Sequence, residues 1–288
     1  MAVANRVPGP ARPGLDHAPG PEARGSVTTR TSTRGHWESF WKDRHAVEEV
    51  YSNGDRIVRN LQKVTRLEGL RVLEVGAGTG RDSFPLAQCG ARVVQLDYSV
   101  QSLAILRSLA AQQNIPVEIV GGDTFSLPFR NDSFDVVFHQ GLLEHFREPA
   151  AQRLLEENIR VLRPGGLLLV DVPQRFHAYT VAKRILIAAG KWFAGWERSF
   201  TIGELARVLE QLGMQPVHRY GEWMVPSFFY RSLREAMKLI GVRLPLMISL
   251  GSWAGRIRLK ARQRLLETPL PLHTGISIGL IARKRGAA

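Results

Sequence analysis

The stretch LRVLEVGAGTGRD, residues 70–82, decides the fold of this chain. Its first half is a short apolar run of the kind that forms a buried strand. Its second half places glycines at alternate positions, at Gly76, Gly78 and Gly80. Because glycine has no Cβ, such a turn lets the backbone come close to a bound nucleotide-like ligand. A helix that follows the turn would point its N-terminus at that ligand.

A second apolar run, ARVVQLD at residues 91–97, follows a predicted helix and ends in a carboxylate. Asp97 lies 21 positions beyond Gly76. In doubly wound sheets this place faces the cofactor crevice, where a carboxylate accepts hydrogen bonds from ribose hydroxyls. Two alternatives remain open from the residues alone. The glycine turn could serve packing only, and Asp97 could cap a helix, a role that Ser99 could equally fill.

The glycine spacing separates two classes of cofactor site. A nicotinamide site prefers G-x-G-x-x-G, which would need a glycine where this chain has Arg81. The chain reads G-x-G-x-G instead, and Glu74 comes before it. The segment LEVGAGTG resembles the first motif of class I S-adenosylmethionine-dependent methyltransferases. The segments at 121–146 and 161–173 are similar to later parts of the same family, closest to its small-molecule, quinone and lipid methyltransferase group.

The resemblance implies that the matched positions bind one cofactor, S-adenosylmethionine. Each part of the cofactor has its own implied residues. They are Glu74, Gly76, Ala77, Gly78 and Gly80 around the amino-acid end, Asp97 at the ribose hydroxyls, Tyr98, Asp123 and Thr124 at the adenine, and Gln140, beside His139, near the reactive methyl group.

The segment HQGLLEHF, residues 139–146, holds the candidate catalytic residues. Methyl transfer from a sulfonium is an in-line displacement, so much of the catalysis can come from holding acceptor and methyl in line. A hydroxyl acceptor must also lose its proton to a base. We predict this role for His139, Glu144 and His145, with His139 nearest the crevice. Each of the three could equally serve only to pack or to stabilise a helix end.

Alternation of strands and helices from residue 70 onwards predicts the fold class. The pattern indicates an α/β protein with a doubly wound, mostly parallel, seven-stranded sheet, the Rossmann-like methyltransferase fold, with N-terminal helices and helical insertions. The expected strands are 71–75, 92–96, 117–120, 134–139, 166–171, 216–220 and 275–284. The expected helices lie near 83–89, 101–112, 150–162 and 201–212, the last with a capping box at Thr201 and Glu204.

Composition divides the chain into three parts. Residues 1–34 are rich in Pro, Gly, Ser and Arg and are predicted to be a disordered tail. Residues 35–69 show helical apolar spacing and are predicted to be a helical cap over the cofactor. Residues 70–285 are predicted to form the methyltransferase domain.

Two segments interrupt the α/β alternation, at about 176–196 and 224–272. Each mixes aromatic and aliphatic residues with Lys and Arg, and neither has the roughly 20 unbroken apolar residues that span a bilayer. Such segments suit an anionic membrane surface or a lid over a hydrophobic substrate, a packing or oligomer contact, or nucleic acid. His177 and Tyr179, at the start of the first segment, are further candidates for contacting the acceptor.

The remaining composition limits the chemistry. A single cysteine, Cys89, excludes an internal disulfide framework, and no His/Cys metal-ligand spacing occurs, so no metal is predicted. The leading hypothesis is methyl transfer to a small hydrophobic acceptor such as a lipid, quinone or polyketide-like compound, in the cytoplasm, with peripheral membrane attachment as a further hypothesis. An RNA methyltransferase using the basic 224–272 segment and a non-catalytic cofactor-binding subunit are the alternatives. Residues alone leave the oligomeric state open.

Overall fold

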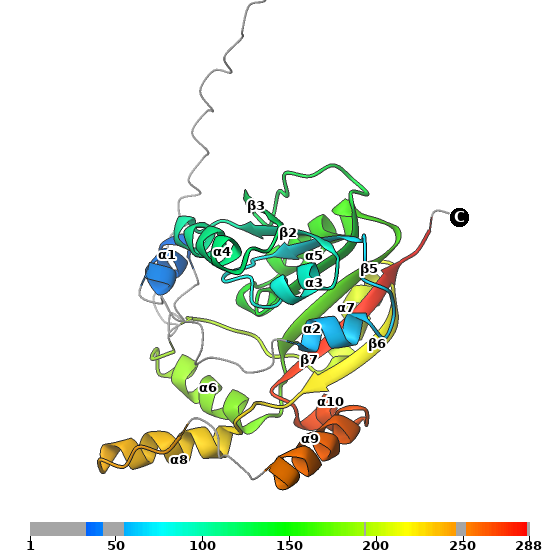
Figure 1. Cartoon of the computed structure of the whole chain (residues 1–288). Coiled ribbons are helices and arrows are strands. Elements are labelled where there is room, and N and C mark those ends of the chain that lie inside the picture. The colour runs from blue at the N-terminus through cyan, green and yellow to red at the C-terminus, as the bar shows by residue number, and fades with distance from the viewer. Residues whose placement is uncertain (1–32, 43–54, 193, 246–251, 287–288) are drawn as a thin grey trace, which may run out of the picture.

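A computed structural model describes residues 33–42, 55–192, 194–245 and 252–286 (Figure 1). Its centre is one seven-stranded sheet in the order β3-β2-β1-β4-β5-β7-β6. The strands are β1 (Arg71–Val75), β2 (Arg92–Asp97), β3 (Val117–Gly121), β4 (Phe134–Gln140), β5 (Leu162–Pro173), β6 (Met214–Glu222) and β7 (Ser277–Lys284). Strands β1 to β5 pair in parallel, and β7 is antiparallel to both neighbours. The predicted doubly wound, mostly parallel sheet is confirmed.

The helices follow the predicted alternation and add the two insertions. They are α1 (Arg34–Lys42), α2 (Arg56–Leu61), α3 (Phe84–Gln88), α4 (Val100–Gln113), α5 (Ala150–Val161), α6 (Ala178–Ala188), α7 (Ile202–Gln211), α8 (Phe228–Leu239), α9 (Ser252–Leu266) and α10 (Leu270–Thr274), with a 3-10 turn η1 (Leu143–His145). The predicted capping box is present: Thr201 Oγ1 accepts from the Glu204 amide and Glu204 returns a bond to the Thr201 amide. The predicted disordered tail and residues 43–54 of the predicted cap lie outside the described residues, apart from 33 and 34.

Alternation along the central strands builds a core on each face of the sheet. Leu73, Val137 and Leu168 belong to the cluster that also contains buried leucines of α5 and α7. Val72, Val136 and Leu169 belong to the cluster with α2 and α3. Because both faces of the sheet are covered, the central strands β1, β2, β4 and β5 are mainly apolar in sequence, whereas the edge strand β3 is less buried.

The same alternation decides the position of His139 in β4. It shares the face of Val137, which α5 and α7 cover, and it is fully buried. Neither ring nitrogen has a hydrogen-bond partner among the described residues. Burial disfavours the charged imidazolium and lowers the pKa of His139 to about 3.

This burial makes the stability of the protein depend on pH. Between the ordinary histidine pKa of 6.5 and about 3, the unfolded chain binds a proton that the folded chain does not. The free energy of unfolding therefore falls as the pH falls, by about 1.4 kcal/mol per pH unit from this residue. Replacing the ring with an apolar side chain, His139→Leu, should remove that part of the slope. Urea unfolding between about pH 6 and about pH 4 measures it.

The control for this test is Phe138→Leu, a change at the adjacent, equally buried position that does not titrate. It should lower the free energy of unfolding without altering the slope against pH. A His139→Leu protein that keeps the parent slope would show that His139 is charged, or accessible to protons, in the folded state.

Candidate active site

The glycine turn between β1 and α3 forms the floor of the site. Gly76, Gly78 and Gly80 have φ values of +71°, +56° and +67°, in the left-handed region that favours glycine. The amides of Gly76 and Ala77 donate to the Leu96 carbonyl of β2, at 2.8 and 3.0 Å. A Cβ at Gly78 would lie 2.9 Å from the indole ring of Trp41, so α1 packs directly on this turn. The turn serves more than strand connection, because it borders the cavity described next.

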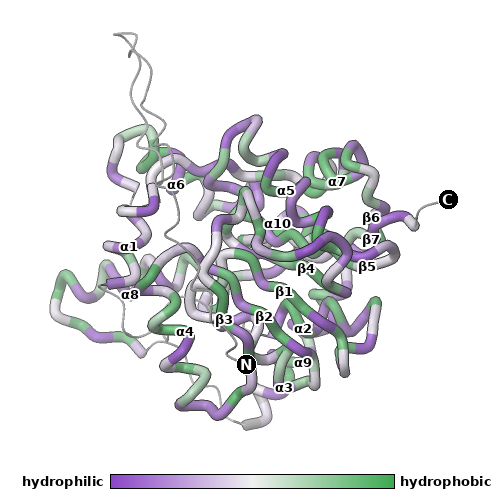
Figure 2. Tube along the Cα trace, turned by 90° about the horizontal axis from the view of Figure 1, so that it is seen from above, coloured by the Kyte–Doolittle hydropathy of each residue, from purple (hydrophilic) through white to green (hydrophobic). Residues whose placement is uncertain are grey.

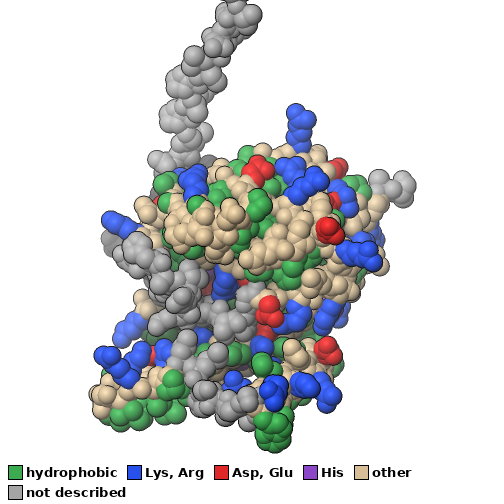
Figure 3. Space-filling model, viewed as in Figure 1, with side chains coloured by type: hydrophobic (Ala, Val, Ile, Leu, Met, Phe, Trp, Pro, Cys, Tyr) green, Lys and Arg blue, Asp and Glu red, His purple; other side chains and the backbone are tan. Residues whose placement is uncertain are grey.

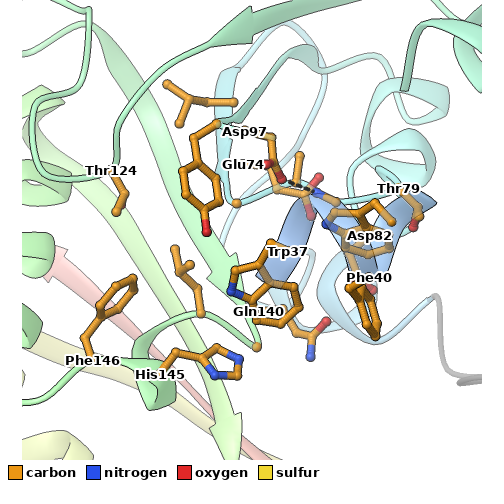
Figure 4. Close-up of a pocket in the computed structure, with 18 of the residues that line it drawn as sticks. Trp37, Phe40, Glu74, Thr79, Asp82, Asp97, Thr124, Gln140, His145 and Phe146 are labelled. Atoms are coloured by element: carbon orange, nitrogen blue, oxygen red, sulfur yellow. Dashed lines mark hydrogen bonds between the residues drawn. The ribbon is translucent and has the colours of Figure 1, made fainter. Parts of the chain in front are cut away.

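A cavity of about 320 Å³ lies at the carboxyl ends of β1, β2 and β4 (Figure 4). Of the predicted cofactor residues, all except Gly80 line it. The lining is Trp37, Phe40, Trp41, Glu74, Gly76, Ala77, Gly78, Thr79, Arg81, Asp82, Leu96, Asp97, Tyr98, Gly122, Asp123, Thr124, Phe125, Gln140, Gly141, Leu142, His145, Phe146, Ala194 and Glu197. Gly80 lies just below, where a Cβ would press on Gln95, Leu106 and Phe84.

Asp97 is held rigidly at the end of β2. Its Oδ2 accepts from the Gly78 amide at 2.8 Å and its Oδ1 from the Ser99 amide at 2.9 Å. Ser99, not Asp97, caps α4, because the Ser99 hydroxyl accepts from the Ser102 amide. Burial raises the pKa of Asp97 above its ordinary value, and the Ser99 and Gly78 hydrogen bonds offset only part of this rise. Each oxygen keeps further lone-pair capacity, which suits a pair of ligand hydroxyls.

Two further carboxylates, Glu74 and Asp82, line the cavity on the same side as Asp97 (Figure 4). Glu74 Oε2 and Asp82 Oδ1 are buried and have no hydrogen-bond partner among the described residues. Burial raises the pKa of Glu74 well above its ordinary value, and the neighbouring Asp82 raises it further. A ligand ammonium placed here could donate hydrogen bonds to these two oxygens. Arg81 contacts Asp82 at 3.0 Å and also lines the cavity, where it offers a cation to a ligand carboxylate.

The residues predicted for the adenine border another part of the cavity. Tyr98, Asp123 and Thr124 all line it. Asp123 Oδ1 accepts from the Phe125 amide at 2.9 Å, and the Thr124 hydroxyl has no partner among the described residues. A flat heteroaromatic group could stack on the aromatic rings here, and the polar side chains could hydrogen bond to the atoms at its edge.

The three candidate bases occupy different environments. His145 lines the cavity, and its ring meets Trp37 edge-on at 5.0 Å between centroids. Burial lowers the pKa of His145 to about 4, so its imidazole is neutral at pH 7. Glu144 is buried behind it, and burial raises the pKa of this carboxyl to about 8. His139 does not border the cavity, since the pleat of β4 turns Gln140 towards it instead.

Glu197 completes the cavity wall and has no signal in the sequence pattern. Its Oε2 accepts from Lys183 of α6 at 2.5 Å and its Oε1 from the Trp192 indole at 2.7 Å. Lys183 is buried although it lies on a short exposed helix. Long-range ion pairs of this kind leave no periodicity, so sequence reasoning could not find them. The segment 176–196 therefore supplies part of the wall, next to His145.

Helix α1 forms the other wall through a contact that is also non-local. Glu38 accepts hydrogen bonds from the Val100 and Gln101 amides and the Ser99 hydroxyl, at the start of α4. Burial raises the pKa of Glu38, and these hydrogen bonds outweigh it and lower the pKa overall. This contact sets the aromatic residues of α1 over the cavity; Figure 4 shows Trp37 between Glu74 and His145.

Two further expectations concern His177, Tyr179 and metals. His177 caps α6 by accepting from the Tyr179 amide at 3.1 Å, and neither residue lines the cavity. In the described parts of the chain, no group of three His, Cys, Asp or Glu side chains could hold a metal ion. Asp171 is instead paired with Arg56 and the Tyr220 hydroxyl.

Comparison with known proteins agrees with this geometry. A methyltransferase domain family matches residues 72–166. A ubiquinone biosynthesis O-methyltransferase of Cereibacter sphaeroides (strain ATCC 17025) is 30% identical over 196 residues, which cover 66% of this chain and 77% of that protein.

Solved structures agree on the fold. The magnesium protoporphyrin IX methyltransferase of Synechocystis PCC 6803, with bound SAH, has a TM-score of 0.55 at 16% identity, covering 87% of this chain and 93% of that one. A cyclase structure has a TM-score of 0.58 at 19% identity, covering 92% and 100%. The cyclase has the same fold although its name gives a different reaction, so the fold does not identify the reaction. The family assignment therefore rests on the sequence similarity to the Cereibacter sphaeroides protein. The chain belongs to the class I S-adenosylmethionine-dependent methyltransferases, with S-adenosylmethionine as its cofactor.

Proposed function

We propose that this enzyme methylates a hydroxyl group on a small hydrophobic acceptor, of the lipid, quinone or polyketide-like kind. The observation that carries the proposal is the composition of the cavity on the side away from Asp97. That side combines an apolar, largely aromatic wall with one neutral imidazole and one fixed carboxylate. Such a site suits a ligand that has an apolar body and a single polar group.

The apolar wall comes from three separate parts of the chain. Trp37 and Phe40 come from α1, Leu142 and Phe146 from the turn after β4, and Ala194 from the segment after α6. Phe146 also packs edge-on against Phe125 at 5.0 Å between centroids. These side chains exclude water and favour a ring or isoprenoid-like body over a strongly charged one.

The polar pair on this wall suits a hydroxyl. His145 Nδ1 has no partner among the described residues and His145 is neutral at pH 7, so the ring can accept a proton. Glu197 is fixed in position by the hydrogen bonds that it accepts from Lys183 and the Trp192 indole. Its remaining lone pairs can accept a hydrogen bond from the acceptor or stabilise the imidazolium after proton transfer.

S-adenosylmethionine supplies a methyl group on a positively charged sulfur, which makes the leaving group good without further activation. The residues of the chain then bind and orient. Asp97 would hold the ribose hydroxyls, Glu74 and Asp82 would bind the cationic amino group, and Arg81 would bind the carboxylate. The acceptor hydroxyl would give its proton to His145 while its oxygen takes the methyl group, with the sulfur–carbon bond breaking and neutral S-adenosylhomocysteine leaving.

The relatives support the same acceptor class. The matched Cereibacter sphaeroides protein is named an O-methyltransferase of ubiquinone biosynthesis. A quinone precursor unites the two features that this wall accommodates, a ring hydroxyl and an apolar body. RNA is the competing acceptor, because the segment 224–272 holds nine Lys and Arg against two Asp and Glu.

The test uses purified enzyme, methyl-labelled S-adenosylmethionine and total cell extract. After reaction, the extract is separated into organic-soluble, aqueous small-molecule, protein and RNA fractions. We expect label in the organic fraction, as an O-methyl group by NMR chemical shift. Label in RNA would replace the proposal with the RNA alternative, a C-methyl product would remove the hydroxyl, and binding of cofactor without any transfer would favour a non-catalytic subunit.

His145→Ala should lower kcat by about a hundred-fold, the usual contribution of a general base. The pH profile adds a second measurement. Because the pKa of His145 lies at about 4, the base is neutral across the neutral range, and kcat/KM should show no acid limb near the ordinary histidine value of 6.5. An acid limb at that value, or full activity without the imidazole, would contradict the assignment.

Glu197→Gln should raise KM for the acceptor by about ten-fold, because it removes a charge-assisted hydrogen bond from the wall. The affinity for the cofactor should stay the same. Glu156→Gln, an equivalent change on the exposed side of α5, is the matched control. A change in cofactor affinity that equals the change in KM would place Glu197 on the cofactor side instead.

Asp97→Ala should weaken the binding of S-adenosylmethionine by about ten- to a hundred-fold, the value of hydrogen bonds to a charged group. Isothermal titration calorimetry measures the affinity. Asp97→Asn is the control for folding, since its one carbonyl oxygen can still accept from the Gly78 or Ser99 amide. Unchanged affinity in the alanine variant would remove Asp97 from the cofactor site.

A further inference from the structure

Helix α8 shows its apolar side to solvent. Phe229, Leu233 and Ile240 are 75%, 52% and 70% exposed and fall on one side of the helix by their spacing. The other side is less exposed and carries Arg231 and Arg234 together with Tyr230 and Met237. A surface helix normally has the reverse arrangement, with the apolar side inward. This orientation leaves an apolar stripe uncovered.

Helix α6 has the same reversed orientation. Val181 and Ile185, one turn apart, are 52% and 66% exposed, while Thr180 and Lys183 on the other side are buried. The inward direction of Lys183 has a cause, because it pairs with Glu197 at the active-site wall. Anchoring the polar side inside leaves the aliphatic side outside.

Helix α9 adds aromatic surface and positive charge. Trp253 is 70% exposed and Ile257, one turn later, is half exposed. The helix contains no acidic residue, and its cations are exposed except for Arg262, which pairs with Glu222. The exposed cations are Arg256, Arg258, Lys260 and Arg264.

The three helices lie at one end of the molecule. Figure 1 shows α6, α8 and α9 below the sheet, and Figure 2, viewed at 90°, shows them spread across that end rather than stacked. Figure 3 shows hydrophobic side chains at this lower end with Lys and Arg beside them. We call this surface the basal face, made of the exposed residues of α6, α8 and α9.

We infer that the basal face docks on an anionic lipid bilayer. Exposed Phe, Leu, Ile and Trp side chains would enter the headgroup–acyl boundary, and the neighbouring Lys and Arg would meet the anionic headgroups. No helix in the described part of the chain is long and apolar enough to cross a membrane. The helices would therefore lie in the plane of the interface.

The charge decides between lipid and the other occupants of an apolar surface. A second copy of this chain would bring two basal faces together across a two-fold axis, and the four exposed cations of α9 would face their own copies. RNA would satisfy the cations but would leave the aliphatic stripes of α6 and α8 in water. An anionic bilayer satisfies both the cations and the stripes.

The experiment measures binding of the full chain to vesicles, so it does not depend on the acceptor. Vesicles of pure phosphatidylcholine are compared with vesicles of equal parts phosphatidylcholine and phosphatidylglycerol, by co-sedimentation. We expect binding to the anionic vesicles that weakens as salt is added. Binding of equal strength to both vesicles, or to neither, would overturn the inference.

The apolar part of the basal face is tested with Ile185→Ser combined with Leu233→Ser. Both side chains are exposed, so the fold should remain intact, and the partition coefficient onto anionic vesicles should fall by about ten-fold or more. The control is Val100→Ser combined with Val217→Ser, two exposed apolar residues away from the basal face. Equal loss in both variants would show that the effect is not specific to this face.

The charged part is tested with Arg258→Glu combined with Lys260→Glu, which should also lower the partition coefficient at least ten-fold. Reversal of two exposed arginines elsewhere, Arg92→Glu with Arg107→Glu, is the control and should have a smaller effect.

Sedimentation of the protein alone, without vesicles, tests whether the basal face binds a second copy of the chain. A dimer that Leu233→Ser dissociates, without vesicle binding by the parent, would assign the face to a second copy and reject the bilayer.

Discussion

The buried guanidinium of Arg56 holds the cofactor half of this enzyme together. Its Nε lies 3.1 Å from Asp171 Oδ2 at the end of β5, and its terminal nitrogen lies 3.9 Å from Asp82 beside the glycine turn. The Tyr220 hydroxyl of β6 donates to the same Asp171 oxygen at 2.9 Å. Loss of one partner from such a buried set typically costs about 3–5 kcal/mol, because the remaining charges stay buried. Thus α2, before the sheet, is joined to β5 through Asp171 and brings its guanidinium beside Asp82 at the cavity.

The cofactor half could be predicted from sequence because its determinants are local. The turn around Gly78 follows β1 directly, and the acidic residue Asp97 closes the next strand, so two strand ends supply much of the cavity lining predicted to bind the cofactor. The capping box at Thr201 is equally local and is also present as predicted. Parallel strands bring their carboxyl ends to one edge of a sheet, and this rule converts order along the chain into proximity in space.

The acceptor half could not be predicted in the same way, because its contacts join distant segments. Lys183 and Glu197 meet through an insertion of irregular pattern, and Glu38 reaches the start of α4 across sixty or so residues of sequence. A single step of the pleat also separates Gln140, which lines the cavity, from His139, which is enclosed in the core. Sequence spacing places both residues at the end of β4 but does not say which face the crevice uses.

One ion pair explains both the buried side and the exposed side of helix α6. On α6, Lys183 is drawn inward by Glu197, and the aliphatic side chains at 181 and 185 turn outward as a geometric consequence. An ion pair in the acceptor wall and an apolar stripe on the surface are therefore opposite sides of one helix. If the stripe rests on a bilayer, the wall that reads the acceptor lies one helix diameter, about 10 Å, from the lipid phase. A hydrophobic acceptor would then reach His145 from the lipid with little exposure to water, which gives the reversed orientation of α6 a use in catalysis.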